Sequence, residues 1–322
     1  MANSRPKICI VGRIELTRVC VEALCEAGVR IGLIVGWRGA YNHIAGGANM
    51  AGIAARIGVP LHKTLDINAP ETLAAIRKRR CELLVVTGWS QLLGAEALGL
   101  CPLGAVGLHP TRLPEGRGRA PIPWTILKRL KTSAVTLFHL TPGVDDGDII
   151  AQCELPLIHN NATRGELLGY NADLLYLEVC EASKRLLVTN VPLILAGNAA
   201  RTPQDHSKAT YWPKRRPQDG VIRWSRSAES IALLVDAVTH PFPGAYCRHP
   251  DGGNLIVWRA FTDRLPNIPH DPLPIGTVER VTEDMHHLVV ACGRDGTDRV
   301  HLAQFQAPRG NRRRIQPEER LG

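Results

Sequence analysis

The chain has 322 residues, of which 44% are hydrophobic and 21% charged, with a formal net charge of +9. This length allows two domains with separate cores, and the absence of an apolar run of eighteen residues argues against a transmembrane helix. The first apolar run is too short for a signal peptide, and the nine dispersed cysteines include no Cys-x-x-Cys pair. We therefore expect a cytoplasmic protein with free thiols, without a disulfide framework or metal site.

The positive charge is spread over the chain, and only the tail after Pro308 is strongly basic. Such a surface suits a small anionic ligand, a nucleotide diphosphate or polyglutamate, at least as well as a nucleic acid.

The first half of the chain alternates short apolar runs with amphipathic segments. Strands are expected at 7–11, 29–35, 82–87 and 105–109, and helices at 15–27, 50–57 and 70–80. This alternation predicts a doubly wound, Rossmann-like parallel sheet, in which ligands bind at the carboxyl ends of the strands. Neither a Gly-x-Gly-x-x-Gly motif nor a Walker loop is present, so the usual nicotinamide and ATP sites are unsupported.

The second half continues with a helix at 121–129, strands at 134–140 and 149–157, and a helix at 164–187. Short strand-like runs at 220–224, 255–260, 288–292 and 299–305, with a helix at 227–238, predict a smaller β-barrel of the OB type. The expected domains are a catalytic domain at 1–197, a proline-containing linker at 198–219, the β-rich domain at 220–308, and a disordered basic tail at 309–322.

Two titratable residues at predicted strand ends and turns have the chemistry for proton transfer. His109 ends an apolar run before Pro110, and an imidazole there can shuttle protons near neutral pH, although a structural histidine would look the same. Asp145 lies in an acidic glycine turn, which is also ordinary turn chemistry and lacks the spacing of a calcium loop. Arg117 and Arg119 would either hold a phosphate or brace their loop.

The order of these residues is more specific than any one of them. The block His109-Pro110-x-x-Leu113-Pro114-x-x-Arg117-Gly118-x-Ala120-Pro121, followed by Gly143-Val144-Asp145-x-Gly147, resembles the signature of 10-formyltetrahydrofolate-dependent formyltransferases. This family includes methionyl-tRNA, glycinamide ribonucleotide and sugar-nucleotide formyltransferases. Residues 215–224 and 240–245 resemble the C-terminal domain of the family, so the likeness covers most of the chain.

Within the family, Arg117 to Pro121 together with Trp124 are most similar to the sugar-nucleotide N-formyltransferases, such as those acting on UDP-4-amino-4-deoxy-L-arabinose. A tRNA enzyme would carry a Lys/Arg-rich insert after the second strand. Here residues 36–47 contain one arginine, whereas an RNA-clamping loop needs several phosphate contacts. A tRNA acceptor is therefore less favoured.

The resemblance implies N10-formyltetrahydrofolate as cosubstrate, no metal, and an amine acceptor. Its implied catalytic pair is His109 and Asp145. The implied folate contacts lie in two segments: Gly88, Trp89, Ser90, Gln91, Leu92, Leu93, and Thr141, Pro142, Gly143, Val144. The implied acceptor contacts are Pro110, Arg117, Gly118, Arg119 and Trp124.

One departure from the family pattern concerns catalysis directly. The family carries an asparagine two residues before the histidine, and that position here is Gly107. Losing one such oxyanion donor typically costs about 100- to 1000-fold in rate. Three explanations stay open: Thr111, a backbone N–H or a water replaces the amide; the enzyme is slow or uses another acyl donor; or only binding remains.

The resulting prediction is formyl transfer to a primary amine, first of all an amino sugar on a nucleotide carrier. The alternatives are initiator tRNA, a hydroxyornithine-like amine, and a non-catalytic folate- or nucleotide-sugar-binding protein. We expect acceptor choice to reside in residues 36–49 and 160–163. The β-rich domain is a candidate surface for a homodimer.

Overall fold

The computed structural model describes residues 8–41, 45–157, 170–262, 270–281, 287–308 and 314–322. The chain divides into two compact units. The first comprises Met1–Pro121, Thr132–Pro156 and Leu177–Pro213, and the second comprises Ile122–Lys131, Leu157–Tyr176 and Lys214–Gly322. The first unit thus extends past residue 197, the predicted end of the catalytic domain.

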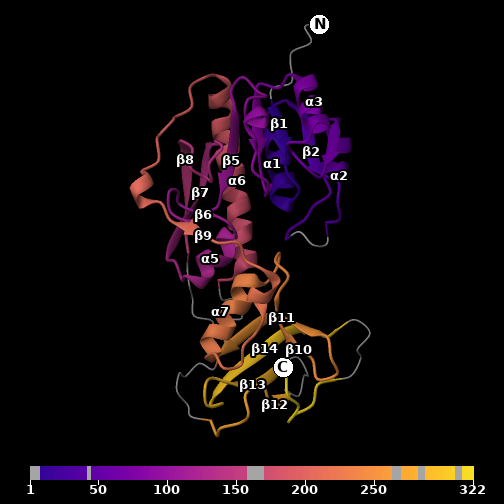
Figure 1. Cartoon of the computed structure of the whole chain (residues 1–322), viewed down its shortest axis with the longest axis vertical. Helices are drawn as coiled ribbons and strands as arrows, with labels where there is room; N and C mark the ends of the chain where they lie inside the picture. The colour runs from indigo at the N-terminus through magenta and orange to yellow at the C-terminus, as the bar shows by residue number, and fades with distance from the viewer. Residues whose placement is uncertain (1–7, 42–44, 158–169, 263–269, 282–286, 309–313) are drawn as a thin grey trace. The chain divides into compact units, whose positions relative to one another are not determined.

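The first unit is built on a seven-stranded sheet with strand order β3-β2-β1-β4-β5-β7-β8 (Figure 1). The strands are β1 (Ile8–Val11), β2 (Ile31–Trp37), β3 (Leu61–Thr64), β4 (Leu83–Val86), β5 (Ala105–His109), β7 (Thr132–His139) and β8 (Ile149–Pro156). The predicted parallel sheet is confirmed from β3 to β5. However, β7 pairs antiparallel with β5 and β8 antiparallel with β7, so the whole sheet is mixed. The connection 140–148 is too short for a parallel crossover, which needs about a dozen residues or more.

Apart from the short α4, the helices of this unit lie where the alternation predicted them. They are α1 (Glu15–Glu26), α2 (Ala51–Arg56), α3 (Pro70–Arg79), α4 (Ala95–Leu98) and, from Leu177 onward, α6 (Ala172–Leu195). The face of α1 that buries Leu16, Cys20 and Leu24 has the spacing of an amphipathic helix. Gly28 follows its C-cap with φ +76°, a conformation that glycine adopts without steric cost. The expected helix at 164–187 is seen only from residue 172, because 158–169 lie outside the described residues.

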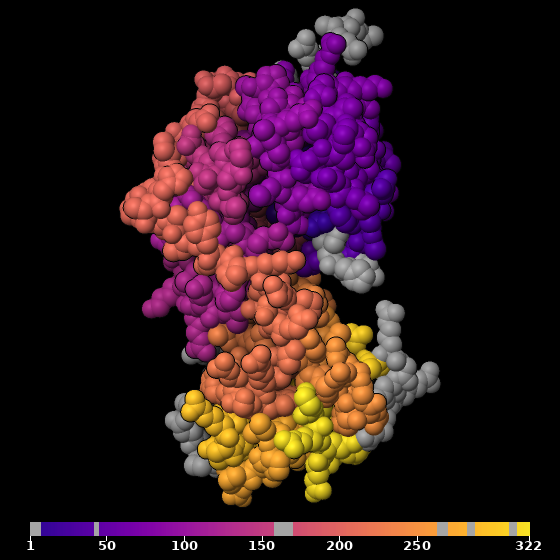
Figure 2. Space-filling model, in the orientation of Figure 1, coloured from indigo at the N-terminus to yellow at the C-terminus, as the bar shows by residue number. Residues whose placement is uncertain are grey.

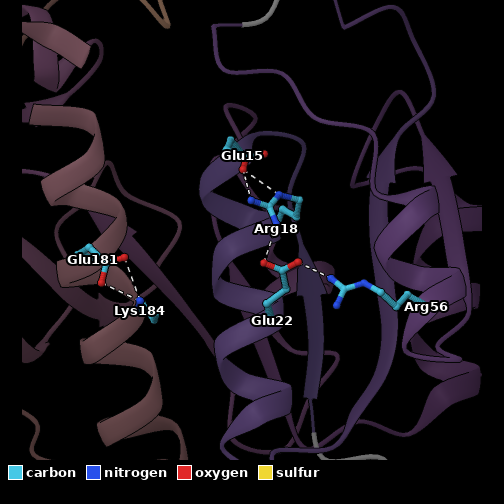
Figure 3. Close-up of polar contacts among 6 residues, drawn as sticks. All are labelled: Glu15, Arg18, Glu22, Arg56, Glu181 and Lys184. Atoms are coloured by element: carbon cyan, nitrogen blue, oxygen red, sulfur yellow. Dashed lines mark hydrogen bonds and ion pairs between the residues drawn. The ribbon is translucent and has the colours of Figure 1, made fainter. Parts of the chain in front are cut away.

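A chain of ion pairs connects α1 with α2 (Figure 3). Arg18 contacts both Glu15 and Glu22, and Glu22 also contacts Arg56. The side chains of Arg18 and Arg56 are 39% and 62% exposed, so these pairs contribute little to stability. They form a solvated charged surface. In α6, Glu181 and Lys184 form a similar exposed pair (Figure 3).

The predicted linker, 198–219, is not a free connection in its first part. Up to Pro213 it lies on the surface of the first unit (Figure 2). Its strand β9 (Tyr211–Trp212) pairs with β6 (Arg117–Gly118), and Gln204 is buried. The pairing needs a glycine at 118, where φ is +105° and a Cβ would lie 2.6 Å from the carbonyl oxygen of Trp212.

The second unit contains a five-stranded antiparallel sheet with strand order β10-β11-β14-β13-β12. Its elements are α5 (Pro121–Leu127, from Ile122), η2 (Pro217–Gly220), α7 (Ala228–Val238), β10 (Ala245–Arg248), β11 (Asn254–Thr262), β12 (Val278–Val281), β13 (Leu288–Cys292) and β14 (Asp298–Gln306). The β-rich domain and its helix are as predicted, but no pairing of β10 with β12 among the described residues closes the sheet into a barrel. The run 220–224 forms only an isolated bridge from Val221 to Tyr246.

The expectation of a disordered tail is wrong for residues 314–322. Leu321 is 1% exposed, and the backbone of Gly322 exchanges two hydrogen bonds with Arg248 of β10. This apolar contact and the strand-like pairing outweigh the basic composition on which the expectation rested. Residues 309–313 lie outside the described residues. No helix among the described residues is long and apolar enough to span a membrane.

Candidate active site

His109 is the last residue of β5, at the carboxyl edge of the parallel part of the sheet. Its side chain is 8% exposed. The ring Nε2 lies 2.8 Å from the carbonyl oxygen of Gly116, which can only accept a hydrogen bond, so Nε2 carries a hydrogen and donates it. This contact leaves Nδ1 as the nitrogen that can take up or release a proton.

Asp145 faces that nitrogen from the loop after β7. Its Oδ2 lies 3.6 Å from Nδ1 of His109, which is an ion-pair distance but longer than a hydrogen bond, and accepts a hydrogen bond of 2.8 Å from the backbone N–H of Gly118. The other carboxylate oxygen, Oδ1, makes no hydrogen bond to any described residue, and the side chain is 21% exposed. The structure therefore brings the two predicted catalytic residues together, with one carboxylate oxygen open to a substrate.

The backbone of Asp145 is left-handed, with φ +50°, and the side chain of Gln204 contacts its carbonyl oxygen. The amide nitrogen of Gln204 donates to the carbonyl oxygens of Asp145 and Gly147, at 2.9 and 2.7 Å. The carbonyl oxygen of the Gln204 side chain accepts two hydrogen bonds from the Arg117 guanidinium, at 3.2 and 2.7 Å. Arg117 also donates to the hydroxyl of Tyr211 and contacts Nδ1 of His206.

These contacts give Arg117 a structural role. Its side chain is 1% exposed, and its donors are used by Gln204, Tyr211 and His206. No acidic group pairs with it among the described residues, so neutral side chains alone satisfy this buried charge. Arg117 connects β6 with the segment after α6, as expected for a residue that braces its loop, and its contact with an acceptor stays a prediction.

Gly107 lies two residues before His109 on the same face of β5, and the side chain of Leu140 occupies the space where a Gly107 side chain would project. A Cβ at this position would lie 2.7 Å from Cδ2 of Leu140. Thr111, the predicted substitute donor, is 1% exposed, and its hydroxyl lies 3.5 Å from the carbonyl oxygen of Gly116. An apolar side chain therefore occupies the room that an asparagine would need, and the identity of the oxyanion donor stays a prediction.

The two predicted folate segments expose apolar side chains. Leu92 is 61% exposed and Val144 is 40% exposed, each in a loop that follows a strand of the sheet. Gln91, in contrast, is used internally: it accepts from the N–H of Ile67 and the indole of Trp89, and donates to the carbonyl of Leu65. In the other segment, Thr141 donates to Asp146. Leu93 is buried in the core beside α4. The structure thus separates apolar side chains that face outward from residues that shape the loop.

The remaining predicted acceptor contacts differ in position. Arg119 is exposed and donates to the carbonyl oxygen of Ser90 at 3.2 Å, and Pro110 follows His109 directly. Trp124 belongs to α5 in the second unit, where Arg215 lies over its ring, 5.4 Å from the ring centroid. Its assignment to the acceptor stays a prediction.

Some residues at this edge were not among the predicted site residues. Gln204, His206 and Tyr211 lie in the segment interpreted as a linker. Its polar composition is typical of an exposed connection, so it did not indicate the hydrogen bonds that these residues make with Arg117. Arg13 and Trp37 follow β1 and end β2, and their place at strand ends was the available signal. No group of three acidic, histidine or cysteine side chains suited to a metal occurs among the described residues.

Two family models match the chain. The formyl transferase model matches residues 56–173, and the model of the formyl transferase C-terminal domain matches residues 214–316. Together they cover about two thirds of the chain and contain both His109 and Asp145.

The fold is similar to solved structures with low sequence identity. WlaRD, a sugar 3N-formyltransferase solved with dTDP and 5-N-formyl-THF, is 16% identical, with a TM-score of 0.61 over 94% of this chain and 98% of its own. The N-formyltransferase from Helicobacter canadensis, in complex with folinic acid and dTDP-3-aminofucose, is 15% identical, with a TM-score of 0.61 over 93% and 99%. HypX from Aquifex aeolicus, in complex with tetrahydrofolic acid, is 17% identical, with a TM-score of 0.65 over 94% of this chain but 44% of its own. These likenesses establish a shared fold.

Proposed function

Because the chain belongs to the formyl transferase family, we propose that it transfers a formyl group from N10-formyltetrahydrofolate to the primary amine of a nucleotide-linked amino sugar. The observation that carries this proposal is the pair of His109 and Asp145, with one open carboxylate oxygen, at the carboxyl edge of the sheet. Such a pair supplies the proton transfers that acyl transfer to an amine requires.

The residues around the pair suit a folate. The exposed side chains of Leu92 and Val144 give apolar surface for a ring system, and loop backbone near them offers donors and acceptors. When bound, the cosubstrate supplies a formyl group on N10, whose carbon is the electrophile. WlaRD and the Helicobacter canadensis enzyme, solved with folates, support this assignment.

In the proposed mechanism, the amine nitrogen attacks the formyl carbon while the free Oδ1 of Asp145 accepts the amine proton. Rotation of the Asp145 carboxyl group brings this proton to Nδ1 of His109, which in the structure lies 3.6 Å from Oδ2. The resulting imidazolium keeps its second N–H on the carbonyl of Gly116. The positive charge of the imidazolium lies beside the oxygen that becomes negative, and so compensates in part for the missing amide at 107. When the bond between the formyl carbon and N10 breaks, a proton returns to N10 and the product amide forms.

The acceptor is the finer part of the proposal. A nucleotide-linked amino sugar is supported by the dTDP and dTDP-3-aminofucose in the two sugar enzymes above and by the scarcity of basic residues after β2. Part of the predicted specificity loops, residues 42–44 and 160–163, lies outside the described residues. Initiator tRNA and a hydroxyornithine-like amine are the other acceptors to test.

The deciding experiment combines purified protein, 10-formyltetrahydrofolate and a panel of nucleotide-linked amino sugars, hydroxyornithine and Met-tRNA. Tetrahydrofolate release and product mass are followed together. We expect a product heavier by one formyl group with an amino sugar, and at least about a 100-fold lower rate for His109→Ala. Full transfer by His109→Ala would refute the proposed role of the pair.

A second function is favoured by one observation, the apolar side chain of Leu140 over Gly107. It would make the chain a folate- or nucleotide-sugar-binding protein without turnover. Binding of both ligands with no product on any acceptor in the panel would support this second function.

A further inference from the structure

Two arginines contact the same residue near the carboxyl edge of the sheet, and neither takes part in the contacts of His109 and Asp145 described above. Arg13 follows β1 and donates to the hydroxyl of Ser90, while Arg119 donates to the carbonyl oxygen of the same serine. Among the described residues, neither guanidinium makes an ion pair with an acidic side chain. Two positive charges therefore share one neutral residue, at an edge where parallel sheets bind ligands.

The guanidinium of Arg13 is held in place by two indoles. It lies 4.6 Å from the ring centroid of Trp37 and 5.5 Å from that of Trp89, and the two indoles meet edge to face at 5.9 Å. Stacking between aromatic rings fixes the plane of a guanidinium and reduces the entropy lost when it binds an anion. Trp89 is itself fixed, because its indole N–H donates to Gln91.

No acidic side chain among the described residues compensates the charge of this arrangement. Burial and the nearby charge of Arg119 lower the pKa of Arg13 below its ordinary value. A residue that served only to pack between two tryptophans would gain nothing from a second cation close by. An anionic group between the two guanidiniums would remove this repulsion, and each guanidinium would bind it with charge-assisted hydrogen bonds.

We propose that Arg13 and Arg119, together with Trp37, Trp89 and Ser90, form a dicationic subsite that binds an anionic group with two or more negative charges on a substrate of the neighbouring centre. This inference rests on the proposed function, because the reaction offers two sources of such a group. One is the diphosphate of the nucleotide-linked acceptor, and the other is the pair of glutamate carboxylates of the folate. Phosphate and carboxylate oxygens present the same geometry to a guanidinium fork.

The place of Arg119 favours the acceptor diphosphate as the first expectation. Arg119 directly follows Gly118, whose backbone N–H holds the carboxylate of Asp145. The dicationic subsite and the proton acceptor for the amine are therefore connected through one peptide unit. Arg117, two residues earlier, is buried and takes no part, so the two arginines of the Arg-Gly-Arg motif have different functions.

The test is titration calorimetry on the full chain with dTDP or UDP, inorganic pyrophosphate and tetrahydrofolate. The variants are Arg13→Gln, Arg119→Gln and Arg13→Lys, which keeps the charge but loses the planar stack. Arg77→Gln is the matched control, because Arg77 is an exposed arginine of α3 whose ion-pair partner is Glu96 and not a residue of the dicationic subsite. Thermal unfolding of each variant shows that it is folded.

We expect Arg13→Gln and Arg119→Gln each to weaken nucleoside diphosphate and pyrophosphate binding about tenfold to 100-fold, and Arg77→Gln to leave it unchanged. A selective loss of tetrahydrofolate affinity would support the subsite and identify the glutamate carboxylates as its ligand. Less than a twofold change for all three probes, or no binding of any probe by the wild-type protein, would overturn the inference. Formyl transfer, measured separately, distinguishes the two proposals: binding without transfer contradicts only the function, and transfer without an effect of Arg13 contradicts only the subsite.

Discussion

The hydrogen bonds of Gln204 predict that this residue positions Asp145 without touching a substrate. The substitution Gln204→Leu removes two hydrogen bonds from the buried guanidinium of Arg117 and two donors from the carbonyls of Asp145 and Gly147. Arg117 keeps Tyr211 and His206 as partners, so we place the loss of unfolding free energy at the lower end of the cost of an uncompensated buried charge, about 3 kcal/mol.

A second substitution separates stability from positioning. Gln204→Glu restores two acceptors to Arg117 but places carboxylate oxygens, which cannot donate, against the carbonyls of Asp145 and Gly147. We expect this variant to recover much of the stability lost in Gln204→Leu. The left-handed backbone of Asp145 loses the hydrogen bond from Gln204 to its carbonyl oxygen in this variant. We therefore expect kcat to fall about tenfold to 100-fold with little change in KM.

The assay is urea unfolding of both variants together with steady-state formyl transfer over a range of pH. A merely structural role would move stability and leave the kcat of Gln204→Glu near that of the wild type. Such a result, or a Gln204→Leu protein as stable as the wild type, would refute the reasoning.

Three further predictions concern other parts of the chain. Gly107→Asn alone should lower the free energy of unfolding by about 1–3 kcal/mol, because its Cβ meets Leu140. In a Leu140→Ala background, Gly107→Asn should raise kcat at least about tenfold over Leu140→Ala alone. An equal kcat would show that an amide at position 107 has no catalytic use. Burial raises the pKa of Asp236 from 3.8 to about 7, although the charge of Arg259 opposes the shift. Between these two pH values the folded state keeps the proton and the unfolded state loses it, so the free energy of unfolding should fall as pH rises from about 4 to about 7. Asp236→Asn should remove that fall in urea midpoints, and an identical pH dependence in both proteins would contradict the assignment. Of the nine free cysteines only Cys25 and Cys153 are partly exposed, so a thiol reagent under native conditions should modify at most these two. Cys153 should react first, because burial raises the pKa of Cys25. Rapid modification of a third thiol would contradict the buried positions.

Features that depend on neighbours along the chain followed directly from the amino-acid sequence. The alternation of apolar runs and amphipathic segments predicted the strands β1, β2, β4 and β5 and the helices α1, α2 and α3, because burial of one face needs only a local period. The order of His109, the Arg-Gly-Arg loop and Asp145 was specific enough to indicate the family that the comparisons confirm.

The tertiary structure alone decided which of these residues meet and in what role. Arg117 and Arg119 are two residues apart and identical in chemistry, yet one is a buried brace and the other an exposed neighbour of Arg13. Arg117 lies in β6, and its pairing with β9, about ninety residues away, places the side chain against Tyr211 and Gln204. The backbone leaves strand geometry at Gly118, where φ is +105°, so Arg119 does not share the face of Arg117. The roles of Gln204 and Leu140 could not be predicted from the sequence for the same reason. Gln204 binds the carbonyl oxygen of Asp145 and Leu140 fills the space beside Gly107, and both contacts depend on packing between distant segments, which no local pattern encodes.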